Sequence, residues 1–337
     1  MKAGRIVAPR SIELVDLAEP KCGPGEVIVQ LEYACLCGTD SPFFAYDFDA
    51  LRVEGKRLME RRLDYSRESL YPMQVGLPLH ECVGMVVESR YSGLAPGDFV
   101  LAFPAGMDGF QELLLLPGER VYPLPLKRVP KEEMLLCQPL GTILYGFRKL
   151  PELRGRSVAV VGQGPIGQLM NAELARLGAR KIIGIDKLGT RLEKSRAMGA
   201  TSVINASEGD MLTRFMDINH GDLADVVIEA VGHVELAVTL CMDLVAQDGQ
   251  VLVFGAHDAD LVDDYPSGVA MRKNVSVHHS IGAWHAEHFL PAAEMIANGV
   301  FNLSGLITHR FPIARAQEAF ETFVDRKDGC LKVLLEF

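Results

Sequence analysis

The chain has 337 residues, 48% of them hydrophobic and 23% charged, with a formal net charge of −10 and a pI near 5.4. Because domains cluster near roughly 100 to 200 residues, this length favours two domains. The acidic balance, without a local cluster of Lys and Arg, argues against nucleic acid as a partner. No apolar run reaches about 18 residues and Met1–Val7 lacks the pattern of an export or transit signal, so we expect no membrane partner and a cytoplasmic location.

The cysteines have no spacing typical of a disulfide framework. They stand at positions 22, 35, 37, 82, 137, 241 and 330. An odd number of cysteines in a chain without an export signal favours free thiols, with Cys37 as a candidate metal ligand.

The first part of the chain is predicted to be mostly β. Residues 26–32 and 83–88 alternate apolar and polar side chains, as half-buried strands do. Glycine and proline interrupt the short apolar runs between residues 83 and 127, which is typical of hairpins and loops. Residues 51–70 carry many charges around apolar positions and predict an amphipathic helix, either a solvated surface helix or a lid or oligomer contact.

From residue 151 onward, apolar strands alternate with helical stretches, which predicts a parallel sheet covered on both faces. The expected strands are residues 157–161, 181–185, 226–230 and 250–254, and beyond this sheet we expect helices at 291–298 and 314–325 and a strand at 331–337. The last fifty residues are expected to pack on the first domain. The predicted fold class is therefore α/β, with a doubly wound parallel-sheet domain at residues 151–284 inserted into a mostly-β domain of residues 1–150 and 285–337.

A glycine-rich turn follows the first strand of the predicted parallel sheet. It contains Gly162, Gly164, Pro165, Ile166 and Gly167, and a helical stretch follows directly. Between a strand and a helix, this motif is typical of a dinucleotide site. Gly162 permits the tight turn, Gly164 lets the backbone approach a pyrophosphate, and Gly167 lets the helix pack closely. The pyrophosphate is then expected at the helix N-terminus, which favours negative charge.

Asp186 ends the next predicted strand. A carboxylate there accepts hydrogen bonds from the adenosine ribose and repels a 2′-phosphate, so we expect NAD rather than NADP. Lys187 and Arg191 add positive charge nearby, which weakens this preference.

Two further motifs lie in the first domain, Cys35-Leu36-Cys37-Gly38-Thr39-Asp40 and Leu79-His80-Glu81-Cys82-Val83-Gly84. Thiolate, imidazole and carboxylate groups suit a borderline-soft divalent ion, and three protein ligands with one open position are typical of catalytic zinc. Together with the glycine turn, these motifs resemble the zinc-dependent medium-chain dehydrogenase/reductase family, closest to its polyol (sorbitol) and threonine dehydrogenase branch. The resemblance continues through residues 95–100, 109–112, 138–140 and 306–311.

The resemblance implies a GroES-like catalytic domain split around a Rossmann domain. It makes Cys37 and His80 zinc ligands, and Glu81 a nearby carboxylate that can reach the metal. Asp40 would be the partner of His80. Thr39 would hydrogen-bond the substrate oxygen and start the path of its proton to solvent.

The implied activity is hydride transfer from an alcohol, polyol or sugar-derived hydroxyl to NAD, assisted by zinc. Family members pair through the edge of the Rossmann sheet, here near residues 275–281, so a homodimer or homotetramer is expected.

The sequence departs from the family pattern at three places. Gln138 stands where the polyol branch has a glutamate, and an amide is a poorer zinc ligand, so the third ligand is either Gln138 or the adjacent Cys137. Leu79 replaces the glycine that usually precedes the His-Glu pair. Residues 103–109 contain no cysteine, so we expect one catalytic zinc and no structural zinc.

Two alternatives remain at this stage. A zinc-free NAD(P)H-dependent reductase of the quinone or enoyl type would agree with Gln138, and a non-catalytic NAD-binding sensor would keep the fold without the chemistry. A histidine cluster at positions 278, 279, 285 and 288 is interpreted as loop or interface histidines rather than as a metal site.

Overall fold

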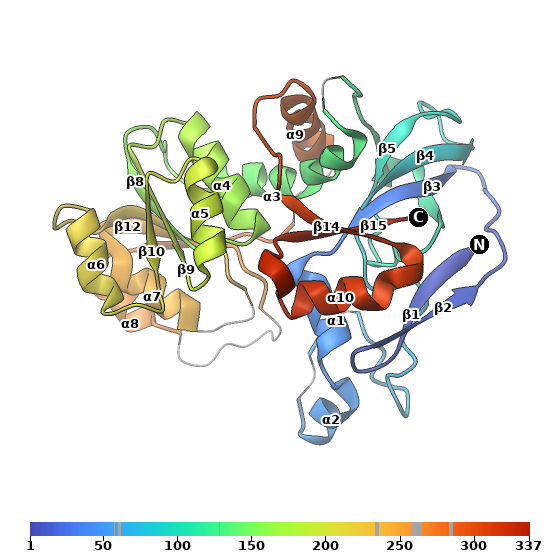
Figure 1. Cartoon of the computed structure of the whole chain (residues 1–337), viewed down its shortest axis with the longest axis horizontal. Coiled ribbons are helices and arrows are strands. Elements are labelled where there is room, and N and C mark those ends of the chain that lie inside the picture. Colours follow the sequence, from blue (N-terminus) through green and yellow to red (C-terminus); the bar gives the residue numbers. More distant parts are fainter. Residues whose placement is uncertain (57, 60–61, 128, 233–235, 258–264, 283–285) are drawn as a thin grey trace. The chain divides into compact units, whose positions relative to one another are not determined.

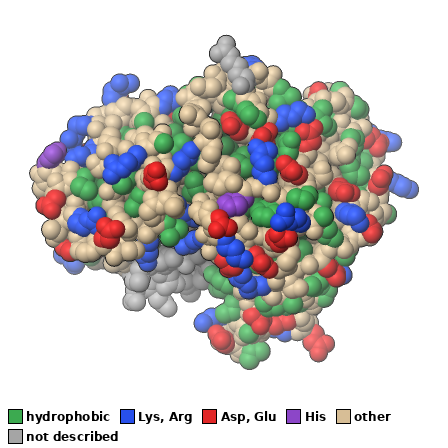
Figure 2. All heavy atoms as spheres, viewed as in Figure 1, with side chains coloured by type: hydrophobic (Ala, Val, Ile, Leu, Met, Phe, Trp, Pro, Cys, Tyr) green, Lys and Arg blue, Asp and Glu red, His purple; other side chains and the backbone are tan. Residues whose placement is uncertain are grey.

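The computed structural model describes residues 1–56, 58–59, 62–127, 129–232, 236–257, 265–282 and 286–337. It contains two compact units: unit 1 is Met1–Gln138 with His285–Phe337, and unit 2 is Pro139–Trp284. Within the described ranges, no helix has the length and apolar character that crossing a membrane requires. On the face drawn in Figure 2, acidic and basic side chains are interspersed.

Unit 1 is built mainly from antiparallel strands. Its larger sheet has the order β14-β15-β3-β4-β5-β7, with β6 also paired to β3, and β1 and β2 form a separate hairpin. Figure 1 shows β3, β4 and β5 side by side in blue to cyan, with the red strand β15 next to β3. The strands are β1 (Lys2–Ala8), β2 (Ser11–Asp16), β3 (Glu26–Cys35), β4 (Glu81–Ser89), β5 (Phe99–Ala102), β6 (Leu113–Pro117), β7 (Val121–Pro123), β14 (Ile307–Pro312) and β15 (Lys332–Glu336).

Unit 1 also contains short helices. They are α1 (Ser41–Ala45), α2 (Phe48–Val53), α9 (Ala286–Ala297) and α10 (Ala316–Val324), with 3-10 turns η1 (Gly38–Asp40), η2 (Gly118–Arg120), η3 (Lys131–Leu136), η4 (Ile313–Arg315) and η5 (Lys327–Gly329). The core is aromatic where α10 packs: the Phe320 ring centroid lies 5.3 Å from that of Phe44 and 5.6 Å from that of Phe110. These rings come from segments far apart in sequence, so the core ties the C-terminal part of the chain to the N-terminal sheet.

The helix predicted over residues 51–70 is wrong for the residues that the structure describes there. Helix α2 ends at Val53, and Gly55, with a φ of 78°, reverses the backbone. Gly55 N donates to Arg52 O and Lys56 N donates to Leu51 O, which is a helix-terminating Schellman arrangement. The prediction failed because the charge pattern outweighed this glycine stop signal.

Unit 2 contains six parallel strands in the order β10-β9-β8-β11-β12-β13. They are β8 (Ser157–Val161), β9 (Lys181–Asp186), β10 (Ser202–Asn205), β11 (Ala224–Glu229), β12 (Val245–Val253) and β13 (Ser276–His279). The helices are α3 (Cys137–Phe147), which begins at the boundary of the units, α4 (Pro165–Arg176), α5 (Gly189–Ala197), α6 (Met211–Ile218), α7 (Leu236–Leu244) and α8 (Ser267–Arg272). Helix α4 packs beside α5, and α6 beside α7 (Figure 1).

The strand order of unit 2 reverses between β8 and β11. Strands β9 and β10 continue from β8 in one direction, and β11, β12 and β13 continue in the other. In sheets of this kind the loops at the carboxyl ends of the two central strands leave a crevice for a ligand. The predicted α/β class with a doubly wound parallel sheet is confirmed. Strand β10 was not predicted, since it has only four residues and little apolar periodicity, whereas β13 lies where the family resemblance places the edge of the sheet.

Candidate functional site

The register between β3 and β4 brings the two candidate metal-binding motifs of unit 1 together. Cys35 at the end of β3 lies opposite Glu81 at the start of β4. Beyond this pair the chain continues to Cys37 on one side and to His80 on the other. The thiol of Cys37, a ring nitrogen of His80 and a carboxylate oxygen of Glu81 all lie within 4.8 Å of one another. Among the described residues this is the group of His, Cys, Asp and Glu side chains with metal-ligand spacing.

Asp40 lies beside both candidate ligand residues. Its Oδ2 accepts a hydrogen bond from Cys37 N at 2.7 Å, and its Oδ1 lies 3.4 Å from His80 Nδ1. Because Asp40 lies beside Nδ1, the Nε2 atom of His80 is the ring nitrogen left to bind an ion. Burial raises the pKa of Asp40. Burial disfavours the charge on His80, but Asp40 and Cys37 outweigh this effect and hold the pKa of His80 well above its ordinary value.

Lys332 is a member of the site that the sequence analysis missed. The residue is 2% exposed on β15, and its Nζ lies 2.6 Å from Glu81 Oε2 and donates to Leu36 O at 3.3 Å. Burial disfavours the ammonium charge, yet the Glu81 carboxylate keeps the pKa of Lys332 above its ordinary value. The sequence signal that could have indicated this buried residue is a single lysine within the otherwise apolar run Leu331–Leu335.

The donor set fits a borderline-soft divalent ion. Glu81 Oε1 and Thr39 Oγ1 are buried, and neither has a hydrogen-bond partner in the part of the chain that the structure describes. Buried polar atoms normally have partners, so these two oxygens are available to an ion or a substrate. One thiol, one imidazole and one carboxylate form a donor set that zinc accepts.

The two predicted alternatives for a third ligand, Cys137 and Gln138, are neighbours in the chain. Cys137 and Gln138 are both buried at the start of α3, and burial raises the pKa of the Cys137 thiol. Cys137 is not part of the group around Cys37 in the described structure. Glu81, which was predicted as a carboxylate that can reach the metal, is part of this group. The choice between Gln138 and Cys137 as a further ligand stays a prediction.

Leu79 anchors the loop that carries His80. Its side chain is fully buried, its N donates to Met107 O at 2.8 Å, and its O accepts from Gly109 N at 2.9 Å. The leucine at this departure from the family pattern therefore adds apolar packing to a loop that is already held by backbone hydrogen bonds.

In unit 2, the glycine turn connects β8 with α4 as predicted. Gly162 has a φ of 96°, and a Cβ atom there would lie 2.8 Å from the carbonyl group of Ala230. A Cβ atom on Gly167 would lie 2.0 Å from Gly162 O. Side chains at these two positions would therefore push the helix and the neighbouring turn away. Gly164 is the N-cap of α4 and has no side chain to cap it, while Pro165 and Ile166 form the first helical turn.

Asp186 binds the glycine turn from the end of β9. Its Oδ2 accepts from Gln163 N at 2.7 Å, and its Oδ1 accepts from Leu188 N at 2.9 Å. Arg191 Nη1 lies 3.9 Å from Asp186 Oδ2 and 3.6 Å from the position of a Cβ atom on Gly164. The two predicted cofactor residues, Asp186 and Arg191, therefore lie beside the turn and beside each other.

The histidine cluster lies partly outside the described residues, since His285 is not among them. His278 Nε2 lies 3.1 Å from Gln250 Oε1, and burial lowers the pKa of His279. Among the residues described, His278, His279 and His288 form no group with metal-ligand spacing.

Known proteins resemble this chain over nearly its whole length. A family model described as zinc-binding dehydrogenase matches residues 165–298. The chain is 26% identical over 339 residues to the L-threonine 3-dehydrogenase of Pyrococcus horikoshii, covering 96% of this chain and 95% of that protein. It is 29% identical over 348 residues to the L-threonine 3-dehydrogenase of Bacillus licheniformis, covering 96% and 94%.

Among solved structures, L-idonate 5-dehydrogenase from Escherichia coli has a TM-score of 0.82 and 21% identity, covering 100% of this chain and 98% of that one. At this identity the likeness concerns the fold. Taken with the family model and the relatives of matching length, it supports the resemblance on which the sequence motifs were interpreted: the chain is similar to medium-chain dehydrogenases of the zinc alcohol dehydrogenase type.

Proposed function

We propose that the chain is a zinc-assisted, NAD-dependent dehydrogenase that oxidises a hydroxyl group of a small alcohol, polyol or sugar derivative to a carbonyl group. The observation that carries the proposal is the approach of Cys37, His80 and Glu81 to within 4.8 Å of one another. Relatives named as threonine dehydrogenases and a structural neighbour named as an idonate dehydrogenase support it. The zinc-free reductase and the non-catalytic sensor are not favoured, because the matching family is described as zinc-binding dehydrogenases.

In this mechanism Cys37, His80 and Glu81 would hold the zinc, with Gln138 as the further predicted ligand. When bound there, zinc supplies Lewis-acid polarisation of the substrate oxygen and lowers the pKa of the substrate hydroxyl. Asp40 fixes the tautomer and orientation of His80. Thr39 Oγ1, which is buried and unpaired among the described residues, would accept a hydrogen bond from the substrate hydroxyl, orient the substrate, and pass its own proton on toward solvent as it takes up the hydroxyl proton.

Lys332 acts on this site through Glu81. Its ammonium group binds Oε2 and leaves Oε1 for the metal, so the carboxylate keeps one orientation. A buried carboxylate without this cation would carry an uncompensated charge in a low-dielectric environment.

We further propose NAD as the cofactor, with the pyrophosphate on the N-terminus of α4. Asp186 supports this choice because its carboxylate lies at the end of β9, where the adenosine ribose binds in this fold. Arg191, 3.9 Å away, offsets part of its charge and moderates the exclusion of NADP.

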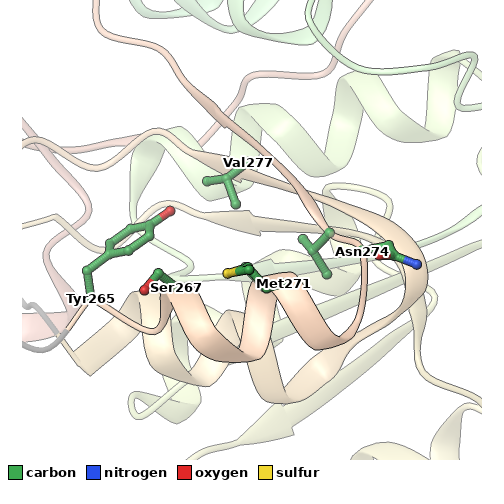
Figure 3. A pocket seen from close by; sticks show the side chains of 7 residues that line it. Tyr265, Ser267, Met271, Asn274 and Val277 are labelled. Carbon is green, nitrogen blue, oxygen red and sulfur yellow. The ribbon is translucent and has the colours of Figure 1, made fainter.

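We also propose a homo-oligomer that forms through β13, the edge strand of the sheet in unit 2. Among the described residues, β13 pairs only with β12, and a groove of about 470 Å³ lies between α8 and β13 (Figure 3). Met271 in this groove is 79% exposed, and Ile281 just beyond the strand is 74% exposed. A second copy that pairs antiparallel with β13 would supply hydrogen-bond partners for the edge strand and cover these side chains in a self-complementary interface.

The cytoplasmic location stays a prediction from the sequence.

The metal assignment predicts zinc content. Purified protein should hold about one zinc ion per chain, and removal by a strong chelator should abolish NAD reduction with an alcohol panel until zinc returns. Cys37→Ala and His80→Ala should each lose most of the zinc and lower kcat/KM by about 100-fold or more. The measurement is elemental analysis together with steady-state kinetics. Cys22→Ala, outside the site, should retain both properties, and full activity of zinc-free protein would contradict the mechanism.

The Glu81–Lys332 pair predicts a strongly coupled double-mutant cycle. Lys332→Met should destabilise the zinc-free protein by about 3–5 kcal/mol, because it leaves the Glu81 carboxylate buried without a cation. Adding Glu81→Gln should restore part of that loss, since the uncompensated charge disappears. Urea unfolding of the two single variants and the double variant measures the coupling, and additive losses would rule the buried ion pair out.

The cofactor assignment predicts a change of preference in Asp186→Asn. Loss of the negative charge should shift the ratio of kcat/KM for NAD to that for NADP toward NADP by roughly 10-fold. Kinetics with both cofactors at saturating alcohol measures the ratio. Asp217→Asn, an exposed aspartate on α6, is the matched control and should leave the ratio as it is in the parent protein. An unchanged ratio in Asp186→Asn would show that Asp186 does not discriminate.

The edge assignment predicts that a charge at Met271 weakens self-association. Met271→Asp should shift the protein toward the monomer in size-exclusion chromatography with light scattering, because a charge would be buried in the interface. Val53→Asp places the same charge on an equally exposed valine of unit 1 and should leave the mass unchanged. A parent protein that is monomeric at all concentrations would end this proposal.

A further inference from the structure

Glu229, at the carboxyl end of β11, is a buried carboxylate to which the mechanism above gives no role. It is 1% exposed. Its Oε1 accepts hydrogen bonds from Val231 N at 2.7 Å and Gly232 N at 3.0 Å, and its Oε2 accepts from Gly255 N at 2.9 Å. Three backbone donors from two separate turns therefore converge on one side chain.

The two turns that Glu229 joins are in close contact. A Cβ atom on Gly255 would lie 2.3 Å from Gly232 N and 2.5 Å from Glu229 Oε2. The backbone of Glu229 adds to the connection, because its carbonyl oxygen accepts from Phe254 N at 2.9 Å. The described parts of the turn after β11 and the turn after β12 therefore form one connected backbone surface, joined by Glu229.

The strand order indicates which part of the cofactor this surface faces. The glycine turn follows β8, and Asp186 marks the adenosine side at β9. Strand β11 flanks β8 on the other side, with Glu229 paired to Val161. A dinucleotide whose pyrophosphate lies over the glycine turn must extend its other half toward β11 and β12. The Val231 side chain, 40% exposed in this turn, offers an apolar surface there.

We propose that Glu229 is a positioning residue that fixes the turns after β11 and β12 as the support for the nicotinamide half of the cofactor. The inference rests on the proposed NAD-dependent function. It assigns Glu229 no contact with the reacting atoms. Its effect is to hold the backbone in the conformation that the nicotinamide requires before the cofactor arrives, so that binding does not have to order these turns.

Glu229→Gln tests this assignment, because glutamine has a similar size but only one acceptor oxygen. Its amide N–H₂ would face a backbone donor, so at least one turn would lose its hydrogen bond. We expect the Kd of NADH to rise by roughly 10-fold, while the Kd of ADP-ribose, which lacks the nicotinamide, stays within about twofold. Titration calorimetry of both ligands measures the two values. Glu193→Gln, an exposed glutamate on α5, is the control and should change neither.

Equal weakening of NADH and ADP-ribose, or no change in either, would overturn the proposal. If Glu229→Gln does not fold, hydrogen exchange in the cofactor-free parent protein tests the same claim. Peptides covering residues 229–232 and 254–256 should then be protected before NADH is added, and protection that arises only with NADH would overturn it. Failure of the parent protein to bind NADH would instead refute the proposed function, which separates the two outcomes.

Discussion

The antiparallel ladder between β3 and β4 places Cys35 opposite Glu81, and this register decides which side chains meet beyond the strand ends. A slip by one residue would turn every side chain of one strand to the other face of the sheet. Cys37 and His80 would then no longer face a common point. The register is held from both sides: apolar residues of β3 enter the core of unit 1, and β15 pairs with the opposite edge of β3.

Strand β15 also supplies Lys332, whose positive charge compensates the buried carboxylate of Glu81. Lys332 comes from the C-terminal part of the chain and Glu81 from the N-terminal part, yet their charged atoms lie 2.6 Å apart. Isolated, either charge would cost several kcal/mol to bury. The aromatic packing of α10 on Phe44 and Phe110 brings this C-terminal segment onto the sheet, so core packing and site electrostatics depend on each other.

Local features were predictable from the sequence, and features that depend on distant partners were not. The turn at residues 162–167 was found because strand, glycines, helix and acid follow one another along the chain. Lys332 and Glu229 were missed, since each has a meaning only through partners that the fold brings near. The charge pattern of segment 51–70 predicts a helix, but Gly55 ends α2 after Val53. Whether Gln138 binds a metal depends on a side-chain position that no sequence pattern specifies.

The carboxylates around the two candidate sites differ in how their oxygens are used. Both oxygens of Asp186 and both of Glu229 accept backbone N–H groups. Carboxylates bound in this way fix a turn, and they have less capacity left to bind a metal.

Glu81 is different, because its single partner is a cation at Oε2 while Oε1 is buried without a partner among the described residues. A buried oxygen in this state is unfavourable unless something else binds it. It lies within 4.8 Å of a thiol and an imidazole, so among the described carboxylates it is the candidate for a metal ligand, with Lys332 paired to its other oxygen.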